Sequence, residues 1–347
     1  MTLNKDLRGF IALLNSTGCV IELEIELEGL VYRCYLESVS QYPMRTSRFS
    51  RRQFLQNSVT ATGALVLGAG SLLSARSAAA SKRTAVDQVA LGQTGLKISR
   101  LGMGTGSNSG QVQWDLGREG FNSLVKYAYD QGITYFDSSQ SYRTFEWLGG
   151  AIKGLPREKL FIQSKIPGQP EKVLEAIDHH RKVFDTDYVD TMLIHCMIKD
   201  GWTDQWKRIM EGFDEAKAKG WIRSKGVSCH SLPALRGATA TPWAQVHLVR
   251  VNPQGRRIDG PEESVWNDNV HDVSPVVAEL KAMRAKGRGI IGMKIIGNGE
   301  FVNAEDREKS IRFAMSLPEL DAVVIGFKSR GEIDEAIKRM NAALAAG

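Results

Sequence analysis

The segment from residue 160 to residue 195 decides the fold. It begins Leu160-Phe161-Ile162-Gln163-Ser164-Lys165, passes through an amphipathic stretch at 171–184, and ends Met192-Leu193-Ile194-His195. Short apolar runs of this kind predict strands, and the stretch between them has the length and period of a helix. Two strands joined by one helix are expected to lie parallel in one sheet. The segment is therefore one strand–helix–strand unit.

The same unit recurs along most of the chain. Strands are predicted at 100–104, 134–138, 160–165, 188–195, 223–228, 245–251, 290–295 and 322–326. Helices are predicted at 118–131, 145–153, 171–184, 203–219, 232–237, 274–287, 305–316 and 332–345. Eight alternating pairs favour a closed (β/α)8 TIM barrel, with an N-terminal β-hairpin at 86–91 and 97–99. The alternative is an open doubly wound sheet, whose G-x-G-x-x-G turn the Gly102-Met103-Gly104-Thr105-Gly106 stretch does not match.

The composition of the chain limits the classes of function. Its 347 residues include 45 Lys+Arg against 39 Asp+Glu, a net charge of +6 with both signs mixed. This is a mild bias, not the basic footprint of a nucleic-acid-binding protein. Four cysteines without a C-x-x-C pair predict neither a disulfide scaffold nor a metal site. Collagen, coiled coils and multi-span membrane proteins are excluded by composition.

Residues 1–80 are expected to lie outside the barrel. Ser50-Arg51-Arg52-Gln53-Phe54-Leu55 precedes an apolar run at 58–73, which Ser77-Ala78-Ala79-Ala80 follows. Paired arginines, a short apolar run and a small-residue cleavage site resemble a twin-arginine (Tat) export signal at 44–80. This resemblance implies export by the Tat translocase to the periplasm, with no stable membrane span after cleavage. The alternative is a surface helix with a chance arginine pair.

The residues before this signal are unexpected, because an export signal normally begins a protein. We predict that translation starts at Met44, that residues 1–43 are an artefact of gene annotation, and that 81–347 form the mature barrel. Within the extension, the alternation of apolar residues and glutamates at 21–28 predicts a strand. Its evident partner is 31–36, so a hairpin is expected there.

Four polar residues gather at the ends of neighbouring predicted strands. Asp137 ends the second strand and Tyr142 lies in the loop after it, while Lys165 and His195 end the third and fourth. Singly, such residues are most often a helix cap, a solvated lysine or a structural histidine. The carboxyl ends of barrel strands are where the chemistry of this fold lies. Their coincidence at one rim therefore predicts a catalytic site.

These residue types indicate proton transfer. A charged Lys165 is expected to lower the pKa of Tyr142 by stabilising phenolate, and Asp137 to hold Lys165 in an ion pair. His195 is expected to orient a substrate carbonyl by hydrogen bonding. Tyr142 is then the general acid/base that protonates the carbonyl oxygen as hydride reaches the carbon. None of these side chains supplies hydride, so a cofactor is required.

At these residues the sequence resembles the aldo-keto reductase family. The matching segments are LGQTGLKISRLGMG at 91–104, GITYFDSS at 132–139 with Tyr142, EWLG at 146–149 and GVS at 226–228. The resemblance covers about 86–347. It implies an oxidoreductase that reduces the carbonyl of an aldehyde or ketone with NADP(H), using Asp137, Tyr142, Lys165 and His195 as its catalytic tetrad.

The resemblance also implies where the cofactor binds. The turn after the eighth strand, Lys328-Ser329-Arg330, is expected to hold the adenosine 2′-phosphate, which favours NADP(H) over NAD(H). A solvated basic turn that caps the next helix is the alternative. The complete set of expected cofactor-binding residues is Gly104, Thr105, Ser228, Cys229, Lys294, Gly297, Asn298, Gly326, Lys328, Ser329 and Arg330.

Two departures from the family pattern keep other functions open. Ser228-Cys229 stands where the family usually has Ser-Asn, and no residue falls on the usual glutamine of the sixth strand. An exported NADP(H)-binding barrel with a regulatory role is one alternative, and a lyase or isomerase without nicotinamide is another. We expect a monomer with a small-molecule carbonyl substrate. Cys196 and Cys229 are expected to be free thiols, with a disulfide between them as the alternative.

Overall fold

The computed structural model describes residues 10–15, 18–27, 30–37, 83–266 and 268–346. The chain divides into two compact units, Met1–Ala79 and Ala80–Gly347. The predicted export signal at 44–80 lies outside the described residues, as does the predicted start at Met44.

The first unit contains a three-stranded antiparallel sheet in the order β1-β2-β3. Its strands are β1 (Phe10–Asn15), β2 (Gly18–Leu27) and β3 (Leu30–Glu37). The predicted hairpin corresponds to β2 and β3, which pair from Val20 and Glu37 to Leu27 and Leu30. β1 adds a third strand that the sequence pattern did not predict, because its six residues do not alternate in polarity.

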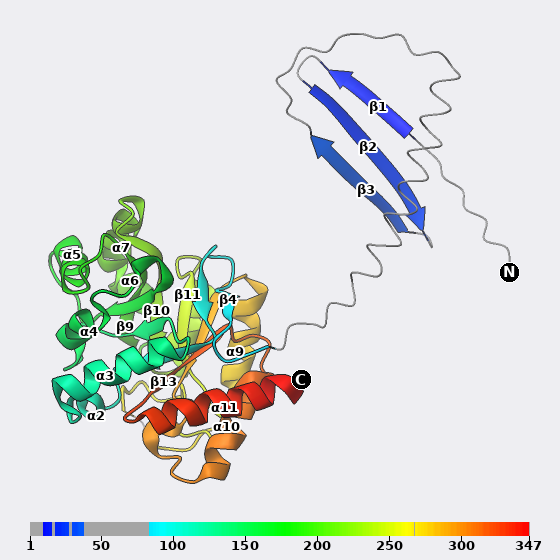
Figure 1. The fold of residues 1–347 in the computed structure, drawn as a ribbon. Coiled ribbons are helices and arrows are strands. Elements are labelled where there is room, and N and C mark those ends of the chain that lie inside the picture. The colour runs from blue at the N-terminus through cyan, green and yellow to red at the C-terminus, as the bar shows by residue number, and fades with distance from the viewer. Residues whose placement is uncertain (1–9, 16–17, 28–29, 38–82, 267, 347) are drawn as a thin grey trace. The chain divides into compact units, whose positions relative to one another are not determined.

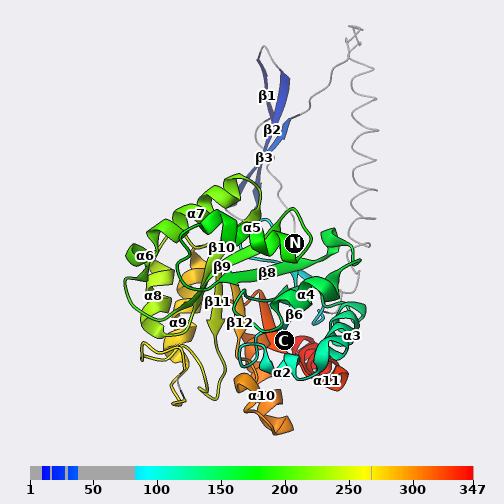
Figure 2. The same cartoon turned by 90° about the vertical axis from the view of Figure 1, so that its left-hand side faces the viewer.

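The second unit is a closed barrel of eight parallel strands, as predicted (Figures 1 and 2). Around the barrel the order is β10-β11-β12-β13-β6-β7-β8-β9. The strands are β6 (Leu101–Gly104), β7 (Tyr135–Asp137), β8 (Phe161–Ile166), β9 (Val189–Met197), β10 (Ile222–Cys229), β11 (Val246–Arg250), β12 (Gly289–Met293) and β13 (Ala322–Gly326). All six residues of β8 are buried, including the polar residues Gln163, Ser164 and Lys165.

Helices surround the barrel on the outside. They are α2 (Gln111–Trp114), α3 (Gly117–Asp130), α4 (Phe145–Ile152), α5 (Val173–Val183), α6 (Trp202–Gln205), α7 (Lys207–Ala218), α8 (Leu232–Ala240), α9 (Ser274–Ala285), α10 (Ala304–Ser316) and α11 (Arg330–Ala346). Figure 1 shows α10 and α11 side by side, with α3 next to α11. Short 3-10 turns, η2 (Arg157–Lys159) and η3 (Gly297–Gly299), complete the unit.

Three helix predictions need correction. The helix expected at 203–219 is two helices, α6 and α7, separated by Trp206. The helix expected at 232–237 continues to Ala240, because Pro233 lies in its first turn, where proline is tolerated. Ser231 caps this helix by accepting a hydrogen bond from the Ala234 backbone N–H at 3.2 Å. The last helix starts at Arg330, two residues earlier than expected.

The predicted hairpin closes one end of the barrel. It consists of β4 (Gln88–Ala90) and β5 (Lys97–Ser99), which pair antiparallel. The hairpin residues Leu91, Leu96 and Ile98 pack with inward-facing strand residues in a buried inner cluster. A larger cluster lies between the strands and the surrounding helices. The hairpin end is therefore filled with apolar side chains, and the opposite end is free for chemistry.

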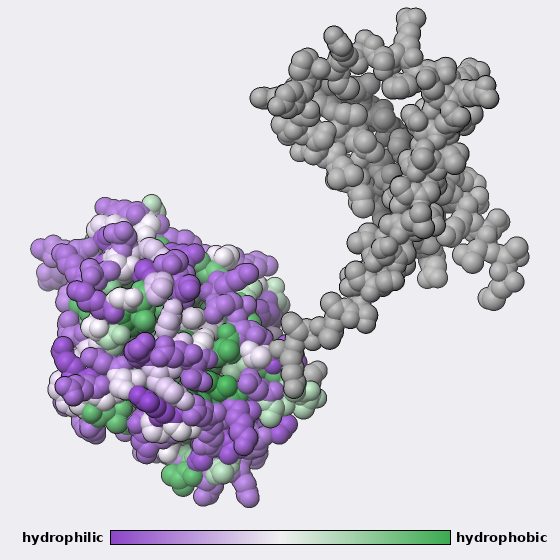
Figure 3. All heavy atoms as spheres, viewed as in Figure 1, coloured by the Kyte–Doolittle hydropathy of each residue, from purple (hydrophilic) through white to green (hydrophobic). Residues whose placement is uncertain are grey.

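The face of the barrel unit shown in Figure 3 is mostly hydrophilic, with hydrophobic residues in small separate groups. Within the part of the chain that the structure describes, no helix combines the length and apolar character needed to cross a membrane. Nor do the described residues bring together three His, Cys, Asp or Glu side chains in a way that could hold a metal ion.

Candidate active site

The four predicted catalytic residues lie together at the carboxyl ends of three neighbouring strands. Asp137 is the last residue of β7, Lys165 lies near the end of β8, and His195 lies near the end of β9. Tyr142 lies in the loop between β7 and α4. Because β7, β8 and β9 are consecutive in the barrel, the strand ends bring these side chains to one rim.

Asp137 and Lys165 form a buried ion pair. Lys165 Nζ donates to Asp137 Oδ1 at 2.6 Å and to Oδ2 at 2.7 Å, and also to the Ser138 carbonyl at 2.8 Å. Lys165 is 1% exposed and Asp137 5%. Burial lowers the pKa of Lys165 from its usual value, and the Asp137 carboxylate opposes this shift. The predicted ion pair is therefore present, and its three hydrogen bonds fix the ammonium group.

Tyr142 lies against both His195 and Lys165. Its hydroxyl is 3.4 Å from His195 Nε2, and Lys165 Nζ lies 4.9 Å from the centre of its ring. The ring packs closely on Gly106, where an added Cβ would lie 2.3 Å from two ring carbons. The prediction of a lowered phenol pKa is wrong. Burial and the negative charge of Asp137 raise the pKa of Tyr142 well above its usual value.

His195 is held by two serines as well as by Tyr142. Its Nδ1 lies 3.0 Å from Ser139 Oγ and 3.4 Å from Ser141 Oγ. Burial, helped by the positive charge of Lys165, lowers the pKa of His195 to about 3. The imidazole is therefore neutral at physiological pH. A neutral ring held at Nδ1 presents Nε2 next to the Tyr142 hydroxyl.

A cleft of about 590 Å³ extends from this cluster across the rim of the barrel. Asp137 and Tyr142 line it, together with five predicted cofactor-binding residues: Gly104, Lys294, Asn298, Gly326 and Lys328. The other six predicted residues do not line it: Thr105, Ser228, Cys229, Gly297, Ser329 and Arg330. The cleft is thus lined by five of the eleven predicted cofactor-binding residues.

Local hydrogen bonds and burial explain why several of these residues lie off the cleft. Thr105 is fully buried and donates its hydroxyl to the Asp137 carbonyl at 3.0 Å. Ser228 Oγ accepts the Cys196 backbone N–H at 3.0 Å. Cys229 is 1% exposed. These buried residues stabilise the backbone at the rim and do not face the cleft.

Lys294 is a cation in the cleft without a carboxylate partner. Its Nζ donates to Asn298 Oδ1 at 2.8 Å, and none of the ion pairs among the described residues involves it. Burial, together with the charge of Arg250, lowers the pKa of Lys294 to about 8. Asn298 Nδ2 in turn donates to Asn108 Oδ1 at 3.0 Å. Asn108 also lines the cleft, and sequence reasoning missed it because its partner is 190 positions away.

The turn after β13 differs from the expected phosphate site. Arg330 Nη2 donates to Ser123 Oγ at 2.8 Å, and its guanidinium lies 5.0 Å from the centre of the Tyr127 ring, so it points toward α3. Ser329 Oγ accepts the Glu332 backbone N–H at 3.2 Å, as in a helix cap. Glu332 lines the cleft and accepts the Lys328 backbone N–H at 2.8 Å. The sequence analysis did not single out this carboxylate.

The two cysteines of the barrel are free thiols. Cys196 follows His195 with a left-handed backbone (φ 61°), and its Sγ lies 3.4 Å from His230 Nε2. Burial raises the pKa of Cys196 to about 11 and that of Cys229 well above its usual value. Neither is therefore an activated nucleophile.

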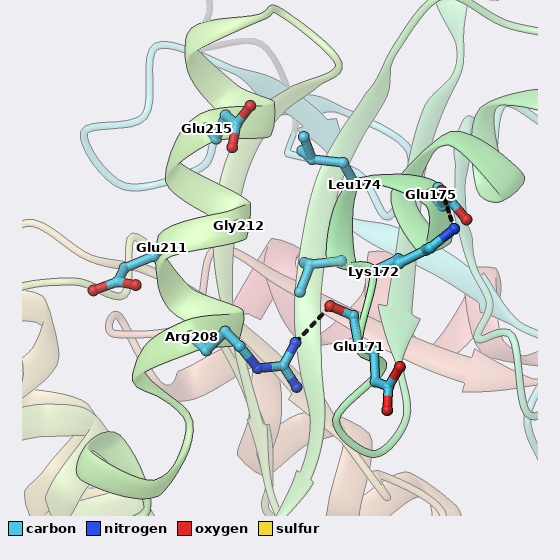
Figure 4. Close-up of a pocket in the computed structure, with 9 residues that line it drawn as sticks. Glu171, Lys172, Leu174, Glu175, Arg208, Glu211, Gly212 and Glu215 are labelled. Atoms are coloured by element: carbon cyan, nitrogen blue, oxygen red, sulfur yellow. Dashed lines mark hydrogen bonds and ion pairs between the residues drawn. The ribbon is translucent and has the colours of Figure 1, made fainter.

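A second hollow, of about 390 Å³, lies outside the barrel between α5 and α7 (Figure 4). Arg208 crosses it and donates to the Glu171 carbonyl at 2.9 Å, and Lys172 pairs with Glu175 at 2.8 Å. None of the predicted site residues lines this hollow. We assign the chemistry to the cleft at the rim.

The barrel, with its polar cluster at the strand ends, defines a protein of the α/β-barrel enzyme class. The model of the aldo/keto reductase family matches residues 100–345. This chain therefore belongs to the aldo/keto reductase family.

Individual relatives agree with this assignment. The chain is 29% identical over 236 residues to the "Probable aldo-keto reductase 1" of Glycine max, covering 62% of this chain and 61% of that protein. It is 31% identical over 141 residues to the NAD/NADP-dependent indole-3-acetaldehyde reductase of Schizosaccharomyces pombe, covering 38% of this chain and 48% of that one. The matches thus span less than two thirds of either relative.

The fold also resembles a solved structure, the holo form of an aldo-keto reductase from Bacillus halodurans. The TM-score is 0.58 at 14% identity, and the match covers 76% of this chain and 96% of that one. At this identity the likeness shows the fold alone.

Proposed function

We propose that this protein is an NADP(H)-dependent oxidoreductase that reduces the carbonyl of an aldehyde or ketone to an alcohol. The observation that carries the proposal is the placement of Tyr142 between His195 and the Asp137–Lys165 pair, at one end of the cleft. Membership of the aldo/keto reductase family supports it. The name of the fission-yeast relative, an NAD/NADP-dependent indole-3-acetaldehyde reductase, supports reduction of an aldehyde with a nicotinamide cofactor.

In this proposal Tyr142 is the proton donor. Its raised pKa keeps the phenol protonated at neutral pH, so the proton is in place before a substrate arrives. Neutral His195 orients the carbonyl oxygen toward the Tyr142 hydroxyl. The Lys165 ammonium, fixed by Asp137, stabilises the negative charge that develops on the phenol oxygen as its proton leaves. The nicotinamide, when bound, supplies the hydride.

The residues of the cleft fit a dinucleotide. Lys294 and Lys328 provide positive charge for phosphates, and Asn298 and Asn108 provide amide groups for polar contacts. The Cβ that Gly299 lacks would meet nothing within 4 Å, so a ligand has room beside this backbone. We propose that Lys294 and Asn298 hold the pyrophosphate and that Lys328 meets the 2′-phosphate. NAD(H) remains the less favoured cofactor.

The test is the Tyr142→Phe variant, which removes the hydroxyl and keeps the ring. Purified wild type is expected to reduce members of an aldehyde and ketone panel with NADPH. The variant is expected to lose that turnover and still bind NADPH, measured by nucleotide fluorescence. Tight NADPH binding without turnover by wild type would favour the regulatory barrel, and turnover of a substrate without nicotinamide would favour a lyase or isomerase.

We also propose that the protein is exported by the Tat translocase and acts as a monomer in the periplasm. The arginine pair Arg51-Arg52 and the apolar run after it are the support for this proposal. Replacing both arginines with lysine is expected to keep the protein in the cytoplasm, as shown by cell fractionation. Mass spectrometry of the precursor tests the start at Met44, because peptides from 1–43 would contradict it.

A further inference from the structure

The inner face of β8 carries an amide in an unusual place. Phe161, Gln163 and Lys165 alternate toward the inside of the barrel, with Phe161 in the apolar inner cluster and Lys165 at the catalytic rim. Gln163 lies between them and is fully buried. A buried amide requires hydrogen-bond partners, or it destabilises the fold. The partners of Gln163 therefore indicate why it is there.

Gln163 connects the core of the barrel to the catalytic carboxylate. Its Nε2 donates to Asp137 Oδ1 at 2.8 Å and to the Tyr135 hydroxyl at 2.8 Å. Since an ionised carboxylate only accepts hydrogen bonds, the nitrogen of the amide must face Asp137. Asp137 Oδ1 thus accepts from both Lys165 and Gln163, and Oδ2 accepts from Lys165 alone. Gln163 is the anchor of this carboxylate that does not belong to the ion pair.

Tyr135 is in turn fixed by the barrel. Its side chain is fully buried in the inner cluster and meets Phe161 edge-on, with ring centres 5.6 Å apart. An added Cβ on Gly102 would lie 2.0 Å from the Tyr135 ring, so this glycine leaves the space that the ring fills. The hydroxyl that orients the Gln163 amide is therefore held rigidly.

We propose that Gln163, oriented by Tyr135, is a positioning residue: it fixes Asp137, and through Asp137 it aims the Lys165 ammonium at Tyr142. The proposal rests on the proposed carbonyl reduction. The Oε1 atom of Gln163 has no hydrogen-bond partner among the described residues. An apolar side chain would avoid that penalty, so a purely structural role does not explain the amide. Electrostatic catalysis, in contrast, depends on fixing a charge to a fraction of an ångström.

The first test compares Gln163→Leu with wild type on the best substrate of the aldehyde and ketone panel. A hydrogen bond to a charged group contributes enough that its loss is expected to lower kcat about tenfold or more, with the KM for NADPH unchanged. The matched control is Thr191→Val, which removes another hydrogen bond in the barrel interior, to Ser224 Oγ at 2.7 Å. The control is expected to keep wild-type kcat. Equal losses in both variants would overturn the proposal.

The second test is Gln163→Glu, which replaces a permanent amide donor with a carboxyl that donates a hydrogen bond only when it is protonated. Asp137, Lys165 and Tyr135 are the charged or titratable groups that face residue 163. A protonated carboxyl can donate to Asp137 Oδ1 in place of the amide, whereas an ionised one repels it. Activity is therefore expected to be nearest to wild type at acidic pH and to fall as the introduced group ionises. A pH profile parallel to that of wild type would contradict the proposal.

Thermal unfolding tests the contact between residue 163 and Asp137 without requiring catalytic turnover. Burial and repulsion from Asp137 both raise the pKa of the introduced carboxyl above that of the unfolded chain. The Tm of Gln163→Glu is then expected to fall relative to wild type as pH rises from about 4.5 through that raised pKa. A Tm difference independent of pH would show that residue 163 does not contact the carboxylate. If wild type proved inactive, the proposed function would be overturned. The pH dependence of the Tm would still test whether residue 163 contacts Asp137.

Discussion

Replacing Asp137 with asparagine is expected to leave Lys165 buried without a counter-ion. Lys165 is 1% exposed, and its ammonium group donates two of its three hydrogen bonds to the carboxylate. An amide offers one acceptor oxygen where the carboxylate offers two, and its NH2 group would face the donor Nε2 of Gln163 or the ammonium itself. The variant thus meets both an unpaired charge and a poor hydrogen-bond arrangement.

The size of the effect follows from two limits. Keeping Lys165 charged after its partner is removed costs about 3–5 kcal/mol of folding free energy. Deprotonating it at pH 7 costs about 5 kcal/mol, because a free lysine has a pKa of about 10.4 and each pH unit corresponds to about 1.4 kcal/mol. The state of lower free energy is populated, so the unfolding free energy of Asp137→Asn is expected to be about 3–5 kcal/mol lower than that of wild type at pH 7.

The sign of the pH dependence separates this explanation from simple loss of packing. In the variant the pKa of Lys165 is lower in the folded than in the unfolded state, so the unfolded chain binds more protons and stability rises with pH. Denaturant unfolding is expected to show that the difference in unfolding free energy between wild type and Asp137→Asn becomes smaller from pH 7 to pH 9. The matched control is Asp185→Asn, which breaks an exposed 4.0 Å contact with Lys153 and is expected to change stability by less than about 0.5 kcal/mol. A loss below about 1 kcal/mol at pH 7, or a gap that does not change with pH, would refute the reasoning.

Three further predictions concern the cleft. Glu332→Gln removes a negative charge beside Lys328. It is expected to strengthen NADPH binding several-fold in fluorescence titrations, with little change in NADH binding. Equal gains in affinity for both cofactors would contradict this prediction. NADPH affinity is expected to fall as pH rises through about 8, where Lys294 loses its proton, and Lys294→Met is expected to abolish that dependence. Gly106→Ala is expected to displace the Tyr142 ring, because the new Cβ would lie 2.3 Å from two of its carbons. Steady-state assays are expected to show a lower kcat and a smaller change in the KM for NADPH.

The strands and the positions of the catalytic candidates could be predicted because they depend on local pattern. Buried parallel strands are continuous apolar runs, and a polar residue at the end of such a run must lie at the rim. Asp137, Lys165 and His195 were found in this way, and the structure places all three at adjoining strand ends. Helix ends were less predictable, since a proline in the first turn of α8 and the break at Trp206 depend on neighbouring packing.

The residues that sequence reasoning missed depend on distant partners. Asn108 meets Asn298 across 190 positions, and Glu332 enters the cleft because of how α11 begins. Arg330 was expected to face the cleft, yet Ser123 and Tyr127 on α3 draw it away. The one local signal that was available is Gln163. An amide that follows Phe161 and Ile162 in a strand expected to be buried indicates a specific partner, because an unpaired polar group there would be costly.

The error in the Tyr142 pKa changes how the site works. The sequence argument weighed only the attraction of Lys165, but Asp137 cancels much of that charge, and burial then dominates and raises the pKa of the phenol. With His195 neutral and Lys165 paired, the catalytic cluster has little net charge. Among the described residues that line the cleft, Lys294 is then the cation without a carboxylate partner, since Lys328 lies near Glu332 and Arg307 pairs with Glu335. Positive charge that could meet a phosphate thus lies outside the Asp137–Lys165–His195–Tyr142 cluster. In the proposed mechanism, a nearly neutral cluster keeps the phenol protonated until a carbonyl oxygen accepts its proton.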